Sequence, residues 1–425
     1  MYSRYFKDVN LFDINRVNEI SYIKYVATSK SFSSIFWSHF HRLFMPLFKR
    51  SSIKKAEILF YGVTINNQRS FSTILHDVKH TFYNLDNNED PLISSYMLYS
   101  LIGLPYLVWL YFSSDEAHRR IIRSNRIVYL LSYGKLISTR RTLKKANPKV
   151  LVMANDHSPM NRCFLWNATI MGIKTVYTQH ASVSNEFPPL SFDYTFLDGQ
   201  MSFDMYGKNS KKGSFVFLAG PCRYDYMKEY LDGDREFVGI SLNEMDDFNL
   251  VKNLCIFLSD KGCTKIKVRS HPSMGLWHFD WFVNNGIDFS QPSQETPGEY
   301  LSKLKLQISN VSGIHLDAVI LKTPTVLFQL STEPIDDVFH FLERGIVKSV
   351  LIEDIFSYIM APSKAIPSES AVRYFVSSYQ TNIEFSVGSF IASVLDTLIE
   401  AGFDNSIIIE NIIRKFGEDI KFYAF

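Results

Sequence analysis

Short runs of apolar and β-branched residues recur along this chain, and each run ends in small, polar or basic side chains. The run at residues 264–268 is followed by Arg-Ser-His-Pro at 269–272, and the run at 304–308 by Ser-Asn-Val-Ser-Gly at 309–313. Runs of this length and composition predict buried strands of a parallel sheet. Because ligands bind outside the carboxyl ends of the strands in open α/β sheets, the residues after each run are candidate binding residues.

The order of these runs predicts two α/β domains. In the first half, strands are expected at residues 58–63, 149–154, 174–178, 194–197 and 215–218. In the second half, they are expected at residues 237–241, 264–268, 304–308 and 325–328. Helical spacing between successive runs makes each half a series of strand–helix–strand units, which fold as parallel sheets.

The length of 425 residues also favours two domains, because one ordinary core does not grow to that size. We therefore predict an α/β protein with two Rossmann-like domains that face each other across a cleft. The first spans residues 1–235 and the second residues 236–365. Residues 366–425 show three helical patterns, which we expect to pack back across both domains.

The net charge is only +2, but the basic residues are concentrated in the first half of the chain. No acidic residue occurs between Glu19 and Glu57 or between Glu116 and Asp156, although both stretches contain many lysines and arginines. Such stretches predict either an anionic partner or a solvated face that the other domain balances. We find no nucleic-acid-binding motif, so a nucleic-acid partner is not expected.

Cellular location is predicted from the cysteines and the apolar segments. The four cysteines lack metal or redox spacing, and the start of the chain lacks a signal-peptide pattern, so we expect a cytoplasmic protein. The most apolar window, residues 101–112, is short and contains Pro105, which predicts a buried helix. Residues 36–50 mix aromatic and basic residues, and predict either an interfacial membrane anchor or burial against the first domain.

Several segments resemble bacterial surface-polysaccharide glycosyltransferases of the GT-B fold, over roughly residues 149–330. In the first half the resemblance lies in Asn-Asp-His-Ser-Pro at 155–159, in residues 172–180, in Pro-Pro-Leu at 188–190, in Phe-Asp-Tyr at 192–194 and in Gly199. In the second half it lies in the segments at 269–272 and 309–313 and in Asp317. The group includes polysialyltransferases, Kdo transferases and CDP-glycerol glycerophosphotransferases.

This resemblance implies a cytoplasmic, metal-independent enzyme that needs no cofactor. A nucleotide-activated sugar would bind to the second domain and the acceptor to the first. The chain departs from the teichoic-acid pattern, in which two adjacent serines fill the phosphate turn, because Ser309 and Ser312 are separated here. The identity of the donor is therefore left open, with a CMP-activated acidic sugar such as Kdo or sialic acid favoured.

Residues of the second domain are candidates for binding the donor. His271 is predicted to hydrogen-bond a phosphate oxygen, the alternative being a capping histidine fixed by Pro272. Arg269 is predicted to clamp a phosphate, unless strand alternation turns it to the opposite face. Ser241 and Asn243 would reach the phosphate from the end of the first strand of this domain.

The segment after residue 308 supplies the other donor candidates. Ser309, Ser312 and Gly313 form a turn before a helix, where a hydroxyl and backbone N–H groups would face an anion. The alternative for Ser312 is an ordinary helix cap. Asp317 is predicted to bind the ribose hydroxyls, the alternative being a favourable acid in the first helical turn.

The base that removes the acceptor proton is sought at the strand ends of the first domain. Asp156 is our first choice and His157 the second, whereas an Asx-turn made by Asn155 or Asp156 is the structural alternative. His180 and Glu186 flank the next loop and are candidates for the base or for acceptor binding. No metal site is predicted, because Asp-Gly-Asp at 232–234 is typical of a turn.

The sequence thus predicts transfer of a sugar from a nucleotide-activated donor to a glycan or glycolipid in capsule or lipopolysaccharide assembly. Expected partners are the nucleotide-activated sugar, an anionic glycan or lipid-linked acceptor, and the inner membrane as a peripheral contact. Within enzymes, the alternatives are a CDP-glycerol-type glycerophosphotransferase and a UDP-sugar 2-epimerase. The non-enzymatic alternative is a basic nucleic-acid-binding module.

Overall fold

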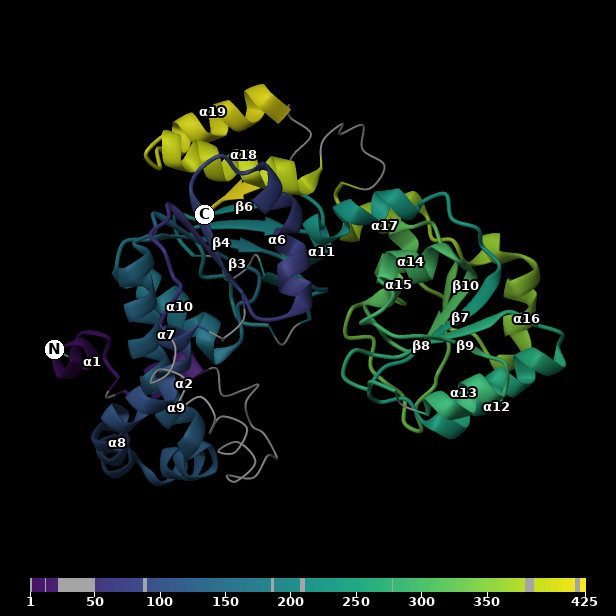
Figure 1. Ribbon diagram of the computed structural model, residues 1–425, viewed down its shortest axis with the longest axis horizontal. Coiled ribbons are helices and arrows are strands. Elements are labelled where there is room, and N and C mark those ends of the chain that lie inside the picture. The colour runs from purple at the N-terminus through teal and green to yellow at the C-terminus, as the bar shows by residue number, and fades with distance from the viewer. Residues whose placement is uncertain are drawn as a thin grey trace.

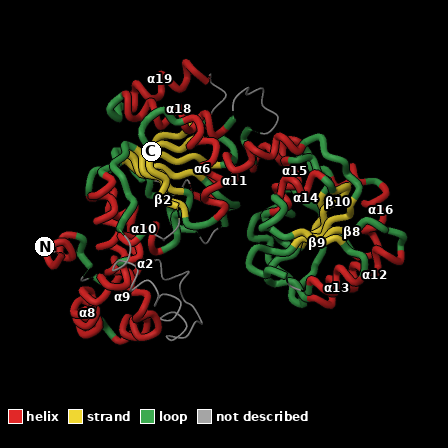
Figure 2. The backbone as a smooth tube through the Cα atoms, viewed as in Figure 1, coloured by secondary structure: helices red, strands yellow, loops and turns green. Residues whose placement is uncertain are grey.

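A computed structural model describes residues 2–11, 13–21, 50–86, 90–184, 187–206, 211–276, 278–378, 386–416 and 421–425 of the chain. It has two α/β lobes that lie next to each other along the longest axis (Figure 1). The first lobe contains a seven-stranded sheet and the second a five-stranded sheet. Helices cover both sheets (Figure 2). The predicted α/β class with parallel sheets is confirmed.

The sheet of the first lobe has the strand order β12-β6-β5-β4-β3-β1-β2. Its strands are β1 (Ile58–Gly62), β2 (Phe82–Asp86), β3 (Val150–Met153), β4 (Lys174–Thr178), β5 (Tyr194–Leu197), β6 (Phe215–Leu218) and β12 (Phe422–Ala424). All neighbours are parallel except β12, which pairs antiparallel with β6. Strands β1, β3, β5 and β6 are buried along their whole length, because helices cover both faces of a parallel sheet.

Two helical layers enclose this sheet, and a third lies outside them. One face packs against α6 (Ile65–Asp77), α18 (Val387–Glu400) and α19 (Asn405–Phe416). The other face packs against α7 (Pro91–Ser94), α9 (Glu116–Ala146), α10 (Pro159–Ile170) and α11 (Gln200–Tyr206). Beyond α9 and α10, a separate apolar core holds α1 (Tyr2–Asp8), α2 (Ile14–Ser21) and α8 (Tyr96–Ser113).

Helix α8 corrects the expectation of a buried helix at residues 101–112. Its inner face buries Leu107 and Leu110 against α9, as expected. Its outer face is apolar as well, and Leu101, Val108 and Phe112 there are 63%, 49% and 71% exposed. Apolar composition alone does not show how many faces of a helix are covered. Among the described residues, the stretch Pro91–Ser113 is long and apolar enough to cross a membrane, and 39% of its most apolar window is buried.

The sheet of the second lobe has the strand order β11-β10-β7-β8-β9, with all neighbours parallel. Its strands are β7 (Phe237–Ser241), β8 (Ile266–Arg269), β9 (Asp288–Ser290), β10 (Leu304–Ser309) and β11 (Thr325–Leu327). One face packs against α12 (Phe248–Asp260), α13 (Phe279–Asn284) and α16 (Ile352–Met360), and α14 (Pro297–Ser302) and α15 (Ile314–Ile320) pack elsewhere on the lobe. The strand order reverses between β7 and β10, which is the point where dinucleotide-binding sheets take their ligand.

The lobes meet at two apolar clusters that form their junction. One joins α11 to the second lobe and to α17 (Glu369–Phe375) through Met201, Val311, Leu316 and Phe375. The other joins the 3₁₀ segment η4 (Cys222–Tyr230) to α14 and α15. After η5 (Pro362–Ala365) and α17, the chain returns to the first lobe, where α18, α19 and β12 complete that lobe.

Candidate functional site

The point where the strand order reverses in the second lobe contains several of the predicted donor residues. Ser241 ends β7 and Ser309 ends β10, and the Ser309 hydroxyl donates to the Ser241 carbonyl at 2.7 Å. Both serines are buried. The Asn243 amide donates to the Val311 carbonyl at 3.4 Å, which ties together the loops that follow the two strands. These three polar groups therefore hold the strand ends in place.

Arg269 and His271 at the end of β8 have opposite environments. Arg269 is only 5% exposed, donates to Ser290 Oγ at 2.7 Å, and lies over the Tyr300 ring at 5.4 Å. The Arg269 side chain is therefore directed inward, which is the alternative that the alternation of side chains along a strand leaves open. The His271 side chain is 42% exposed. Its Nδ1 lies 2.7 Å from Ser273 Oγ, so the ring is held in place by its own turn and remains accessible to a ligand.

The turn after β10 faces the first lobe. A Cβ atom added to Gly313 would lie 3.9 Å from Ser182 Oγ, in the loop after β4. Ser312 Oγ accepts the Ile314 N–H at 3.5 Å, although the N-cap of α15 is Gly313 rather than Ser312. The turn after β10 and the loop after β4 therefore meet at the junction.

Asp317 of α15 also bridges the lobes. Its carboxylate accepts a hydrogen bond from the Tyr224 hydroxyl of η4. Burial raises the pKa of Asp317 to about 7, although the charges of Arg223 and Arg69 act in the opposite direction. The side chain predicted to bind ribose is thus already in contact with the other lobe.

In the first lobe, the loop after β3 presents a histidine backed by a carboxylate. Asp156 is only 2% exposed. One of its oxygens accepts the Tyr206 hydroxyl at 3.0 Å and the other lies 3.1 Å from His157 Nδ1. The His157 side chain is 28% exposed. Asn155 makes the Asx-turn, since its Oδ1 accepts the N–H groups of His157 and Ser158 at 3.1 and 2.9 Å.

His180, at the end of the neighbouring strand, lies close to His157, with ring centroids 6.3 Å apart. Burial lowers the pKa of His180 to about 3, and the charges of His157 and Arg223 add to this effect. The ring is therefore neutral at physiological pH. Its buried Nδ1 has no hydrogen-bond partner in the described part of the chain. Glu186, the other predicted acceptor residue, lies outside the described residues, as do residues 36–49 of the predicted anchor.

Three charged residues of the junction were not predicted. Arg223 forms a buried two-point ion pair with Asp198, with N–O distances of 3.0 and 2.6 Å. Arg69 of α6 lies near enough for its charge to lower the pKa values of Asp317 and Arg269. Asp198 and Arg223 each follow a predicted strand, which is a signal that could have found them. Arg69 lies within a helix, where the sequence gives no such signal.

The described residues contain no group of three His, Cys, Asp or Glu side chains placed to hold a metal ion. What the site does contain is a His–carboxylate pair, a second neutral histidine and several arginines. These groups meet where the strand ends of one lobe approach the turn after β10 of the other. Such an arrangement can remove a proton from a bound hydroxyl and can neutralise a phosphate.

Comparison with known proteins shows the fold to which this site belongs. No family model and no curated protein sequence matches the chain. Among solved structures, a UDP-GlcNAc 2-epimerase from Neisseria meningitidis bound to UDP-GlcNAc aligns with a TM-score of 0.50 at 13% identity, over 82% of this chain and 100% of its own. The S. aureus protein MnaA, solved with UDP, has a TM-score of 0.50 at 8% identity, over 85% of this chain and 98% of its own.

These structural likenesses and the two parallel sheets define the class of the protein. It has the GT-B fold, with two Rossmann-like lobes arranged as in these two structures. The predicted fold class is confirmed at this level.

Proposed function

We propose that this protein is a glycosyltransferase that moves a sugar from a nucleotide-activated donor to a glycan or glycolipid acceptor. The observation that carries the proposal is the His157–Asp156 pair at a strand end of the first lobe, with Nδ1 and Oδ1 3.1 Å apart. A histidine oriented by a buried carboxylate is a common form of general base. The expected setting is cytoplasmic assembly of capsule or lipopolysaccharide.

The geometry favours His157 over Asp156 as the base. Asp156 is buried and both of its oxygens have partners, so its role is to position the imidazole. His157 would take the proton of the acceptor hydroxyl as that oxygen bonds to the anomeric carbon. The bond from that carbon to the donor phosphate breaks, and the nucleotide leaves with the bonding electrons. Cationic groups of the junction, among them Arg69, would stabilise the departing phosphate.

Activity measurements with single substitutions test these roles. We expect His157→Ala to lower kcat by at least about a hundredfold, the usual contribution of a general base, and Asp156→Asn to lower it less. Full activity of His157→Ala would refute the assignment.

Binding of the donor is tested by thermal unfolding with CMP, CDP, UDP and GDP. We expect one of them to raise the melting temperature, since a ligand that binds only the folded state stabilises it. Among the four, CMP is favoured because an acidic sugar is the preferred donor. His271→Ala should weaken this stabilisation, whereas His76→Ala, at an exposed site of the first lobe, should leave it unchanged. Stabilisation by none of the four would contradict the proposal.

Two other reactions remain as candidates on the same fold. A UDP-sugar 2-epimerase would convert UDP-GlcNAc without any acceptor, and a glycerophosphotransferase would consume CDP-glycerol. Incubation with each nucleotide-activated substrate, with and without an acceptor glycan, separates the three reactions. Turnover that requires the acceptor and releases CMP supports the glycosyltransferase, and acceptor-independent conversion of UDP-GlcNAc supports the epimerase.

We also propose that the enzyme works as a peripheral protein at the inner membrane. The support is the outer face of α8, where large apolar side chains are exposed to solvent. An exposed apolar patch of this kind is typical of an interaction surface. Replacing Leu101, Val108 and Phe112 with serine should abolish sedimentation with phospholipid vesicles while the protein remains folded. Unchanged sedimentation would contradict this contact.

A further inference from the structure

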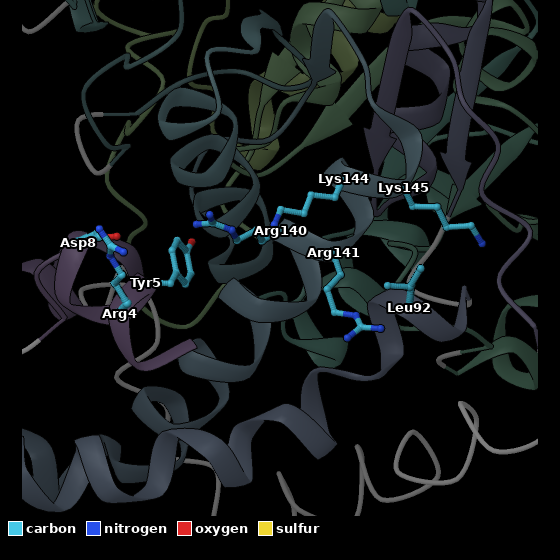
Figure 3. Close-up of a pocket in the computed structure, with 8 residues that line it drawn as sticks. All are labelled: Arg4, Tyr5, Asp8, Leu92, Arg140, Arg141, Lys144 and Lys145. Atoms are coloured by element: carbon cyan, nitrogen blue, oxygen red, sulfur yellow. The ribbon is translucent and has the colours of Figure 1, made fainter. Parts of the chain in front are cut away.

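A strongly basic cavity of about 820 Å³ opens on the first lobe between α1, α7 and α9 (Figure 3). It plays no part in the site described above. Its lining includes the cations Arg4, Arg140, Arg141, Lys144 and Lys145, and among the described residues Asp8 is the only carboxylate that lines it. A concave surface with a large excess of one charge concentrates ligands of the opposite charge.

Helix geometry explains how α9 brings four cations to one cavity. Positions 140, 141, 144 and 145 follow the i, i+1, i+4, i+5 pattern, which places them on one side of the helix over two turns. Arg4 comes from α1, on another wall of the cavity. Favourable interaction with the helix dipole would account for Lys144 and Lys145 in the last turn. It does not account for Arg4, which belongs to another element.

Few of these cations are neutralised within the protein. In the part of the chain that the structure describes, Arg4, Arg140, Lys144 and Lys145 form no ion pair with a carboxylate. Arg140 lies over the Tyr5 ring at 3.9 Å, and Lys145 donates to the Ser51 carbonyl at 2.9 Å. Both contacts fix the side chains and leave their positive charge in place. The cavity is therefore preorganised for an anion.

We propose that this cavity binds a phosphate-bearing ligand, and that its source is the headgroup of a membrane lipid. The cavity lies beside α8, the helix that carries the membrane face proposed above: Arg141 of its lining lies over the ring of Tyr99 in α8 at 5.3 Å, and Leu92 belongs to the preceding helix α7. An apolar face and a basic cavity on neighbouring helices match the two parts of a phospholipid surface, its acyl chains and its charged headgroups. The assignment of the phosphate to a lipid headgroup rests on the membrane contact proposed above. Phosphate binding itself rests on the cavity alone.

The central test is Arg4→Glu/Lys144→Glu, which reverses two exposed charges on two walls of the cavity. Its matched control is Lys212→Glu/Lys421→Glu, two exposed lysines outside the cavity. Vesicles contain phosphatidylcholine and phosphatidylglycerol in equal parts. We expect the cavity variant to bind them at least ~25-fold more weakly, since each cation near an anionic surface contributes about fivefold. A loss of equal size in the control, or none in the cavity variant, would overturn the proposal.

Asp8→Asn supplies a test in the opposite direction. Removing the carboxylate that opposes the cations should strengthen vesicle binding about fivefold, by the same charge argument. If the Asp8→Asn variant keeps the native melting temperature, a gain in binding does not come from misfolding, so this variant keeps the proposal testable if the double substitution destabilises the protein. Weaker or unchanged binding would count against a phosphate in the cavity.

Inorganic pyrophosphate distinguishes a lipid source from a free one. We expect pyrophosphate to raise the melting temperature of the native protein and to do so much less in Arg4→Glu/Lys144→Glu. Equal stabilisation of both would place pyrophosphate elsewhere and overturn phosphate binding by the cavity. If pyrophosphate protection is lost but vesicle binding is unchanged, the cavity binds a free phosphate, and the lipid source is wrong.

Nucleotide binding separates this inference from the proposed function. The cavity variant should keep any stabilisation by the donor nucleotide, because the donor is expected in the other lobe. If no nucleotide binds to the native protein while the cavity variant still loses vesicle affinity, the transferase proposal fails and the phosphate cavity stands.

Discussion

At the scale of single residues, the junction depends on one buried ion pair. Asp198→Asn would leave the buried Arg223 guanidinium without its hydrogen-bonded counter-charge, and we expect a loss of about 3 kcal/mol in the free energy of unfolding. Urea denaturation measures this loss. Glu236→Gln, which breaks the exposed pair with Lys265, is the control and should cost less than about 1 kcal/mol. Equal losses would show that burial of the Arg223 pair has no energetic consequence.

Asp317 should make the stability of the protein depend on pH. Its pKa is about 7 in the folded protein because of burial, whereas an unfolded Asp has a pKa near ~3.9. The folded state therefore holds an extra proton between these values, and its stability falls as the pH rises from about 4 to about 7. Because asparagine does not ionise, Asp317→Asn removes this loss of stability at high pH.

The variant should thus be more stable than the native protein at pH 8, by about 2 kcal/mol after allowance for partial exposure. The difference should be small near pH 4, where the carboxyl is protonated in the folded state and about half protonated in the unfolded state. Urea denaturation at the two pH values measures it. A difference of the same size at both would contradict the raised pKa.

Several candidate residues lie directly after strands, as the sequence predicts, for a physical reason. In parallel sheets the residues after each strand collect at one edge, so Asp156, His157, His180 and His271 could be singled out by position. Burial and pairing could not be predicted, because they depend on contacts across distant elements. Asp156 is the first-choice base in the sequence, but the hydrogen bond that occupies one of its oxygens comes from Tyr206, which lies 50 positions away along the chain.

At the scale of elements, α8 and α9 cross unusually closely. A Cβ atom added to Gly134 of α9 would overlap the backbone carbonyl of Tyr96 in α8. Gly134→Ala should therefore destabilise the protein by about 2 kcal/mol or more, although alanine is the better helix former by about 1 kcal/mol. Thermal or urea unfolding measures the change. Ser124→Ala, at an exposed position of α9, should alter stability by less than about 0.5 kcal/mol.

Interior strands could be predicted from the sequence, and so could the buried edge strand β11, whereas the other three edge strands could not. The predicted runs match the central strands because a strand covered on both faces is apolar along its whole length. Strands β2, β9 and β12 lie at the sheet edges, are three to five residues long, and include polar or exposed side chains. Nothing in such segments distinguishes an edge strand from a loop.

At the scale of the whole molecule, the chain order and the spatial order differ. Residues 386–416 follow the second lobe in the sequence, yet α18 and α19 complete the apolar core of the first lobe, as Figure 1 shows. Helical patterns in the sequence identified these elements but carried no information on which sheet they cover. The first lobe therefore depends on segments from both ends of the chain and cannot be complete until its last helices are present.

This arrangement predicts which lobe responds to a core substitution. Leu395→Ala in α18 should cost about 3 kcal/mol in the first lobe, because Leu395 is fully buried there. Leu258→Ala in α12 is the matched change, since Leu258 is equally buried in the second lobe. Calorimetry or hydrogen exchange, read lobe by lobe, measures both changes. We expect Leu395→Ala to lower protection of β1 and β3 while leaving β7 and β10 unchanged, and Leu258→Ala to do the reverse. If Leu395→Ala instead weakened the second lobe, the last helices would stabilise the neighbouring lobe in sequence rather than the one on which they pack.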